Sequence, residues 1–207
     1  MYKININDNT LHLASSEELK TRNMTKYNMV VAYTGKSKSL LSYIDMLEKS
    51  NRFKKLLIHH KDYQKLKADF KGLYRIIKAS GGVVLNPKGE TLMIFRRGNW
   101  DLPKGKIDEN EGKKAAAVRE VMEETGISKP EIIRKLCKTH HTYKLKGGVR
   151  AIKTSYWYLM KAAKQDLIPQ TEEDIVKAKW VVPKRFLNGE RPIYSNIVRV
   201  LKSADLL

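Results

Sequence analysis

The sequence predicts an α/β protein with two parts: a small N-terminal α/β domain over residues 1–77 and a larger domain over residues 78–207. Short apolar runs alternate with segments of helical periodicity along the chain, which indicates strands and helices in turn. A turn sequence, Asn86-Pro87-Lys88-Gly89, separates two apolar runs and predicts a hairpin. This order of elements is typical of a mixed sheet packed between helices.

Residues 1–77 contain the patterns of four strands and two helices. Alternation of apolar and polar residues predicts two strands, compact apolar runs predict two more, and apolar residues at helical spacing predict the helices. The expected strands cover residues 4–6, 11–13, 29–33 and 56–58, and the expected helices begin near residues 39 and 63. This part contains no catalytic motif or repeat, so its role stays open between capping a site, dimerising and binding a partner.

The larger domain begins after a boundary near residues 74–79, where no Gly- or Ser-rich linker occurs. Strands are expected at 80–85, 92–95, 156–160 and 178–181, with a second hairpin around Gly147-Gly148 and a closing helix at 193–205.

The chain is strongly basic, with 41 Lys and Arg against 22 Asp and Glu and a net charge of +19. Residues 1–77 carry 15 basic and 7 acidic residues, so the charge is not confined to a tail. Such a balance favours phosphates, nucleic acid or an acidic surface as partners, although an ordinary solvated lysine-rich surface explains it equally well.

The single cysteine, Cys137, fits a reducing compartment. The N-terminus lacks a signal pattern, and no apolar run approaches the ~20 residues that cross a bilayer. We therefore expect a cytoplasmic protein without a membrane partner; the oligomeric state is not predicted.

Residues 113–125 favour a helix that Gly126 ends. Helical geometry gathers an apolar face, formed by Ala115, Val118, Val121 and Met122, nearly opposite an acidic face, formed by Glu120, Glu123 and Glu124. Three neighbouring carboxylates suit a hard cation such as Mg²⁺, which can polarise a phosphate and activate water. Taken alone, the same face also fits a solvated acidic surface.

The wider pattern from Gly105 to Ile127 reads G-x5-E-x7-R-E-V-x-E-E-x-G-I and resembles the Nudix box at every fixed position. The resemblance implies a Nudix α/β/α sandwich over residues 78–207 and metal-dependent hydrolysis of a phosphoanhydride bond. It implies Mg²⁺, with Mn²⁺ as the alternative, held by Gly105, Glu120, Glu123 and Glu124. Glu123 would be either a ligand or the base that activates water.

Further roles follow from the same resemblance. Arg119 would orient the glutamates by ion pairing, and Glu111 would support the metal site indirectly. Family members often take another carboxylate from a later loop, where Glu172, Glu173 and Asp174 occur. We choose Glu173, against the alternative of an exposed acidic turn.

The box is preceded by W-x-L-P-K-G-K at residues 100–106. This opening resembles bacterial Nudix enzymes that cleave diadenosine polyphosphates or oxidised nucleoside triphosphates, and also the P-K-G-K-I opening of mRNA decapping enzymes. Lys104 and Lys106 are therefore candidates for neutralising phosphate charge.

Other basic and aromatic residues are candidates for the same pocket. Arg96 and Arg97 precede the loop, and Lys144 lies beside the expected second hairpin. His141 and Tyr143 are candidates for contacting a phosphate or a base. For each, an ordinary surface or strand-packing role is the alternative.

The function that these patterns favour is hydrolysis of a dinucleoside polyphosphate or an (oxidised) nucleoside triphosphate. Alternatives are hydrolysis of an RNA 5′-pyrophosphate or cap, and of a diphosphoinositol polyphosphate. A non-catalytic nucleotide sensor fits poorly, because all four box glutamates are present. A nucleotide-like polyphosphate is the expected partner, and nucleic acid is allowed but not required.

Overall fold

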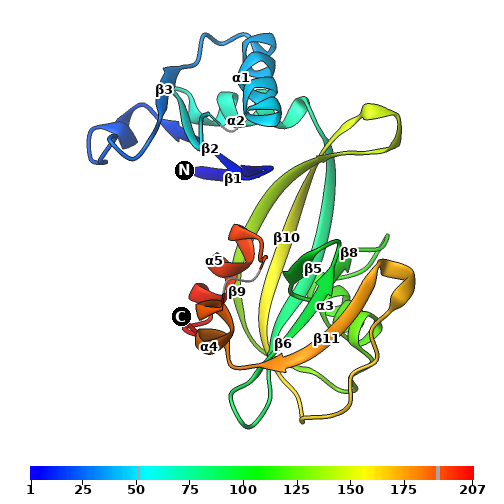
Figure 1. Cartoon of the computed structure of the whole chain (residues 1–207). Coiled ribbons are helices and arrows are strands. Elements are labelled where there is room, and N and C mark those ends of the chain that lie inside the picture. The colour runs from blue at the N-terminus through cyan, green and yellow to red at the C-terminus, as the bar shows by residue number, and fades with distance from the viewer. Residues whose placement is uncertain (51, 190–191) are drawn as a thin grey trace. The chain divides into compact units, whose positions relative to one another are not determined.

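The computed structural model describes residues 1–50, 52–189 and 192–207, which group into two compact units. The first unit consists of residues 1–77 and 140–154, and the second of residues 78–139 and 155–207. The first unit thus contains a segment, residues 140–154, that the sequence analysis assigned to the C-terminal domain. Figure 1 labels the elements of both units.

The first unit is an α/β fold in which the strand order is β9, β1, β2, β4 and β3. Antiparallel β1 (Tyr2–Ile6) and β2 (Asn9–Ser15) form a hairpin, whereas β3 (Met29–Ala32) and β4 (Lys55–His60) run parallel to each other. Helix α1 (Ser37–Lys49) connects β3 to β4, as a parallel pair requires. A short 3₁₀ turn, Glu17–Leu19, follows β2. All the elements expected in residues 1–77 are confirmed.

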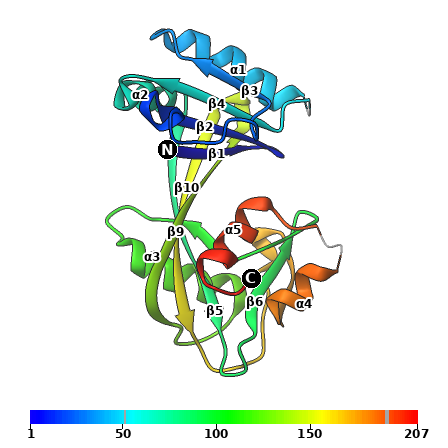
Figure 2. The same ribbon diagram turned by 90° about the vertical axis from the view of Figure 1, so that its left-hand side faces the viewer.

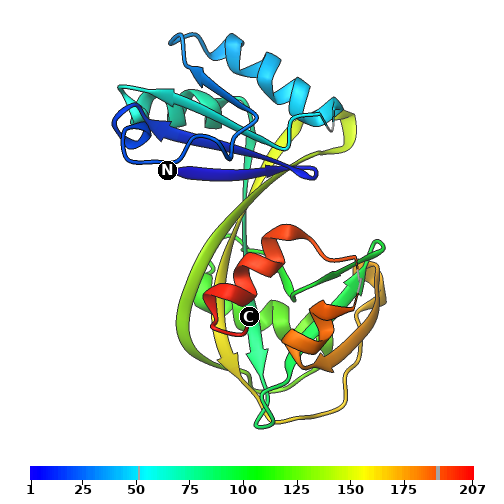
Figure 3. The same cartoon turned by 60° about the vertical axis from the view of Figure 1, so that its left-hand side comes forward.

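The core of the first unit lies between one face of this sheet and two helices, α1 and α2 (Tyr63–Gly72) (Figure 3). The alternation of β1 buries Tyr2, Ile4 and Ile6 on the helix side. Asp62 caps the N-terminus of α2, and its carboxylate accepts a hydrogen bond from the Lys65 amide at 2.9 Å. The apolar side chains that alternate along the strands therefore pack against those at helical spacing in α1 and α2 and form one core.

The second unit has the strand order β11, β6, β5, β10 and β9. Its strands are β5 (Arg75–Leu85), β6 (Thr91–Arg96), β7 (Asn99–Asp101), β8 (Lys104–Lys106), β9 (Glu131–Lys144), β10 (Arg150–Lys161) and β11 (Ile175–Val181), with 3₁₀ turns at Lys146–Gly148 and Thr171–Glu173. Strands β5, β9 and β10 each contribute residues to both units. Both expected hairpins are confirmed.

Successive side chains of these strands point to opposite faces of the sheet and pack in two different cores, each covered by helices. The result is an α/β/α sandwich. Val84 and Tyr158 pack with helix α3 (Lys113–Thr125), whereas Val83 and Trp157 pack with helices α4 (Pro183–Asn188) and α5 (Ser195–Ser203). Figure 2 shows α3 on one side of the strands and the two C-terminal helices on the other. The expected fold class, a mixed sheet between helices, is confirmed.

Three short elements were not expected. Strand β7 pairs with β6 and strand β8 pairs with β5, so the segment between them is fixed along the sheet. Each of these strands has only three residues, too few to show an alternation. Helix α4 has six residues and begins at Pro183. None of the helices in the described part of the chain has the length and apolar character needed to span a bilayer.

Helix α3 occupies the expected residues but buries a different face. Ala117, Val121 and Glu124 are buried, whereas Ala115 and Met122, which the helical wheel placed with Val121 on the apolar face, are exposed. The buried side of the helix is therefore shifted toward its acidic residues, because the carboxylate of Glu124 has partners inside the fold.

Gly126 ends α3 in the left-handed conformation, with φ of 72°, and donates its amide to Met122. A Cβ at this position would lie 2.8 Å from Cβ of Ile168. We expect Gly126→Ala to lower the free energy of unfolding by about 2–3 kcal/mol, because backbone strain of about 1–2 kcal/mol combines with that clash. Urea unfolding measures the change. The control is Gly89→Ala, at φ of 73° with no atom nearby, which carries the strain alone; equal losses would contradict the role of Ile168.

Candidate active site

The guanidinium group of Arg119, on α3, donates hydrogen bonds to three of the box glutamates. Its Nε and Nη2 donate to Glu111 at 2.9 and 2.8 Å, and its Nη1 donates to Oε1 of Glu120 at 2.9 Å and to Oε2 of Glu123 at 2.8 Å. Nη2 also donates to the carbonyl of Lys106 at 2.9 Å. These bonds raise the pKa of Arg119, so its charge is permanent. Arg119 is thus placed beside Glu111, Glu120 and Glu123, and its orienting role stays a prediction.

Glu124 lies in a different environment, with a side chain only 1% exposed. Its Oε2 accepts the Lys104 amide at 2.7 Å, and its Oε1 accepts from the Arg96 guanidinium at 3.3 Å. Burial raises the pKa of Glu124 to about 7, although the charges of Lys104 and Arg96 act in the opposite direction. Glu124 is therefore the most strongly buried carboxylate of the box.

The cations around Glu124 share a second carboxylate, Asp101. The ammonium group of Lys104 lies 2.6 Å from Oδ2 of Asp101, and Nε of Arg96 lies 3.2 Å from the same oxygen. Burial alone would raise the pKa of Asp101, but the two cations hold it below its usual value. Asp101, Lys104, Arg96 and Glu124 thus form a largely buried group of two cations and two carboxyl groups, which we call the buried quartet.

Lys104 and Arg96, which the sequence analysis proposed as phosphate ligands, lie inside the buried quartet. Lys104 is 3% exposed and Arg96 17% exposed, and both neutralise carboxylates of the protein. Asp101 was not among the predicted site residues, because a lone acidic residue in a loop carries no motif. Its only signal was its place three residues before Lys104, at the end of the strand that pairs with β6.

Gly105 lies against the carboxylate of Glu120. A Cβ on Gly105 would fall 1.8 Å from Oε2 of Glu120, so the backbone approaches as closely as only glycine allows. Burial raises the pKa of Glu120; the hydrogen bond from Arg119 opposes this, and the charges of Glu123 and Glu173 add to it. Glu173 contributes to the raised pKa of Glu120 through its charge, and its role as a ligand stays a prediction.

The remaining basic candidates of the second unit are exposed. Lys106 follows Gly105 on β8, and Arg97 lies in the tight β6–β7 turn with φ of 49°. The Arg97 guanidinium pairs with Asp174 at 3.1 Å, and both side chains are more than half exposed. These two cations therefore remain accessible to an anionic ligand.

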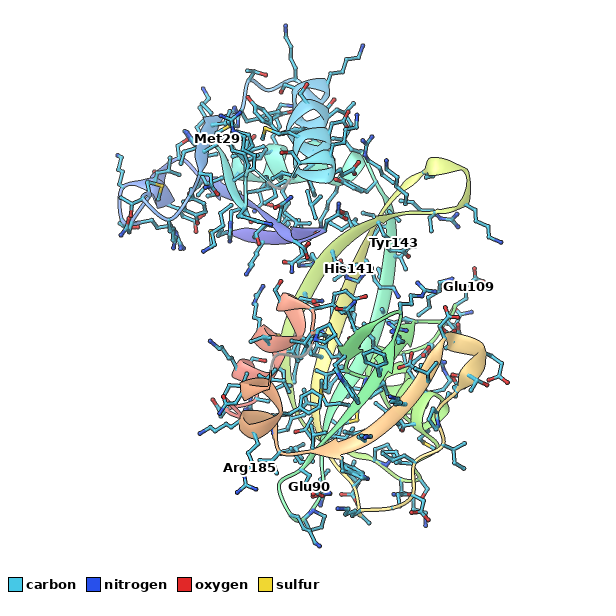
Figure 4. The ribbon with its side chains drawn as sticks, viewed as in Figure 1. Met29, Glu90, Glu109, His141, Tyr143 and Arg185 are labelled. Carbon is cyan, nitrogen blue, oxygen red and sulfur yellow. The ribbon has the colours of Figure 1, made fainter. Side chains whose placement is uncertain are left out.

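Three predicted substrate-binding residues belong to the first unit. Figure 4 shows His141 and Tyr143 on β9, where their rings lie 5.8 Å apart. The ammonium group of Lys144 lies 3.5 Å from Glu48 of α1. The structure thus groups these residues with the N-terminal elements.

A groove of about 600 Å³ runs along the exposed side of α3. Its lining is mostly apolar and consists of Glu111, Lys114, Ala115, Val118, Arg119, Met122, Glu123 and Ile132. Met122 and Ala115 face this groove instead of the core, which accounts for their exposure.

The carboxylates around α3 are the oxygen donors available to a metal ion. In the described part of the chain, no three His, Cys, Asp or Glu side chains are gathered closely enough to hold one as they stand. Arg119, however, contacts only Oε1 of Glu120 and Oε2 of Glu123, so it leaves the second oxygen of each carboxylate unused. Carboxylate oxygens that repel one another are the ligands a hard cation prefers. The residues fit a divalent cation in chemistry.

Comparison with known proteins agrees with the motif and the fold. The NUDIX domain family model matches residues 76–201, more than half of the chain. The chain therefore belongs to the Nudix family.

Two curated relatives and one solved structure illustrate the similarity. The chain is 30% identical to an 8-oxo-(d)GTP phosphatase of Mycolicibacterium smegmatis, over 53% of this chain and 32% of the relative. It is 28% identical to an RNA pyrophosphohydrolase of Erythrobacter litoralis, over 51% and 75%. The NUDIX domain of Shewanella oneidensis NrtR, solved with ADP ribose, superposes with a TM-score of 0.50 at 19% identity, over 70% and 96%, and shows the fold alone. The chain thus spans about a third of one relative and three quarters of the other.

The buried quartet predicts a large effect of Asp101→Asn on stability. The substitution leaves the buried ammonium group of Lys104 without its partner charge, and we expect the free energy of unfolding to fall by about 3–5 kcal/mol. The matched control is Asp174→Asn, which removes the exposed partner of Arg97 and should cost less than about 1 kcal/mol. Urea unfolding of both variants measures the difference, and equal effects would show that the quartet is not a stability element.

The close approach at Gly105 predicts a loss of turnover without a loss of fold. In Gly105→Ala the Cβ displaces the flexible end of Glu120, so we expect kcat to fall by roughly 100-fold while the melting temperature changes little. Gly112→Ala, where no atom lies within 4 Å of the added Cβ, is the control and should retain activity. Equal kinetics of the two variants would exclude Glu120 from the reaction.

Proposed function

We propose that the chain hydrolyses a phosphoanhydride bond in a dinucleoside polyphosphate or an (oxidised) nucleoside triphosphate. The observation that carries the proposal is the grouping of Glu120 and Glu123 on one guanidinium, beside a backbone that approaches Glu120 as only glycine permits. An acidic helix face that was merely solvated would not require the Gly105 backbone to lie against the carboxylate of Glu120. The 8-oxo-(d)GTP phosphatase relative supports a substrate of this class.

Nudix hydrolases generally use a divalent metal such as Mg²⁺. Here Glu120, Glu124 and the carbonyl of Gly105 would hold Mg²⁺ or Mn²⁺, with Glu173 as a further ligand and Glu123 as the base that activates water. A bound ion would polarise a phosphate and lower the pKa of water. The raised pKa of Glu120, caused by burial and by neighbouring carboxylates, favours a cation beside it.

The chain's own residues divide the remaining work. Glu123 has the most exposed carboxylate of the box, at 48%, and accepts the proton from the attacking water. Arg119 fixes the orientation of Glu120 and Glu123 through the bonds described above. Lys106 and Arg97 are the accessible cations, and they contact the polyphosphate chain. The products are a nucleoside phosphate and the remaining phosphate fragment.

A second candidate is hydrolysis at the 5′-pyrophosphate of RNA. The RNA pyrophosphohydrolase relative supports it, and so does the net charge of +19, since a strongly basic protein attracts polyanions such as nucleic acid. The chemistry at the glutamates would be the same, and only the group beyond the phosphates would differ.

A Mg²⁺-dependent hydrolysis screen with chromatographic identification of products tests the proposal. Its substrates are diadenosine tetraphosphate, 8-oxo-dGTP, dGTP, ADP-ribose, a diphosphoinositol phosphate and 5′-triphosphate RNA. We expect Glu120→Gln and Glu123→Gln each to lower kcat by roughly 100-fold or more. The control is Glu131→Gln, which makes the same change at an exposed partner of Lys161 and should retain full activity.

The comparison of substrates decides between the candidates. The highest kcat/KM for a free nucleotide supports the leading proposal, and the highest value for 5′-triphosphate RNA supports the second. Hydrolysis that persists in folded Glu120→Gln and Glu123→Gln would overturn the assignment of the site.

A further inference from the structure

Ser80 is a fully buried residue of β5 whose hydroxyl contacts helix α3. A hydroxyl that is removed from water costs free energy unless it is hydrogen-bonded. The Oγ of Ser80 donates to the carbonyl of Lys113 at 2.6 Å and lies 3.3 Å from the carbonyl of Tyr156 on the neighbouring strand β10. Because a serine hydroxyl has a single proton, the shorter contact, to Lys113, is the main bond.

This bond holds the first turn of α3. Lys113 is the first residue of the helix, and Gly112, which precedes it as the N-cap, has no side chain that could cap the helix. Contacts with the rest of the fold therefore fix where the helix begins, and the bond from Ser80 is one of them. Glu120 lies about two turns further along the same helix, so a displacement of the first turn also moves Glu120.

The backbone of Ser80 holds the element that Glu120 meets. In the antiparallel pair of β5 and β8, Ser80 lies opposite Gly105. The next two residues fix the same segment: the amide of Gly82 donates to the carbonyl of Pro103 at 3.1 Å, and a Cβ on Gly81 would collide with that carbonyl. Ser80 thus contacts α3 through its side chain and β8 through its main chain, and these two elements meet at the candidate active site.

A second buried serine of this unit lacks such a bond. Ser155 on β10 is also fully buried, but in the described part of the chain its hydroxyl has no hydrogen-bond partner. The bond from Ser80 is therefore not a general consequence of burying a serine in this sheet. It belongs to the strand position that lies opposite Gly105.

We infer that Ser80 is a positioning residue of the hydrolytic site. Its hydroxyl holds the start of α3 while its backbone holds β8, and the two contacts together keep the carboxylate of Glu120 against Gly105. The inference rests on the proposed function, in which Glu120 holds the metal ion. Ser80 is buried, so it acts on turnover through Glu120 and not through the substrate.

The kinetic test compares Ser80→Ala with Ser155→Ala, since each removes one buried hydroxyl from the full chain. With the best substrate of the hydrolysis screen, we expect Ser80→Ala to lower kcat about tenfold, because a small misplacement of a reacting group is costly. KM should stay within about twofold, because no contact with the substrate is lost. Ser155→Ala should keep the kcat of the wild type, and Ser80→Thr, which retains the hydroxyl, should recover most of the lost turnover.

A double variant shows whether Ser80 acts through the approach of Glu120 to Gly105. Gly105→Ala already displaces the carboxylate of Glu120, so adding Ser80→Ala to it should lower kcat by no more than about twofold. A full further tenfold loss would show that the two residues act independently and would overturn the inference.

Hydrogen exchange provides a readout that does not depend on hydrolysis. In Ser80→Ala the amides of Ala116 and Ala117, in the first turns of α3, should exchange about 3- to 10-fold faster, the factor that corresponds to one net hydrogen bond. In Ser155→Ala they should exchange as in the wild type. Unchanged exchange in Ser80→Ala, or equal kcat of the two alanine variants, would overturn the inference. A wild type that hydrolyses no substrate would contradict the proposed function instead, and the exchange rates would still show whether Ser80 holds α3.

Discussion

Burial of the Glu124 carboxylate is the constraint on which the second unit depends. A charge removed from water requires hydrogen bonds and opposite charges close by. Glu124 receives them from the Lys104 amide and from Arg96, and Asp101 then balances the cations. These contacts require β7 and β8 to lie along the sheet and α3 to turn its acidic side inward. The close approach of Gly105 to Glu120 follows from the same placement, because Gly105 is adjacent to Lys104.

The sequence predicted those features that depend on local pattern. Strand alternation, turn residues and helix spacing identified most of the elements of both units, since each is a short-range consequence of what must be buried. The helical wheel was wrong about the buried face of α3. It ranked Met122 above Glu124 as a core residue, because hydrophobicity alone takes no account of a carboxylate whose partners lie on other strands. Asp101 was missed for the same reason: its role depends on pairing between β6 and β7.

The basic residues show a second limit of sequence reasoning. A lysine or arginine near a phosphate-binding motif was interpreted as a phosphate ligand, but its role depends on which carboxylate lies nearer. Lys104 neutralises Asp101, and Lys144 neutralises Glu48. Lys106 and Arg97 are exposed, although Arg97 also pairs with Asp174, and Lys144 keeps an exposed side chain despite its pairing with Glu48. The charge of a basic residue makes it a candidate phosphate ligand, and the burial and ion pairing of its side chain then decide whether it can fill that role.

Arg119 offsets part of the repulsion on the acidic face of α3. Glu120 and Glu123 lie one turn apart on α3, and their repulsion would weaken the helix. Arg119 places a permanent charge on the same face and bonds one oxygen of each, together with both oxygens of Glu111. Because Arg119 bonds only one oxygen of Glu120 and one of Glu123, the second oxygen of each is left for a metal ion or for water. Bidentate pairing with Arg119 would occupy both oxygens. The bidentate partner is Glu111, which is the box glutamate that the family resemblance assigns to support and not to metal ligation.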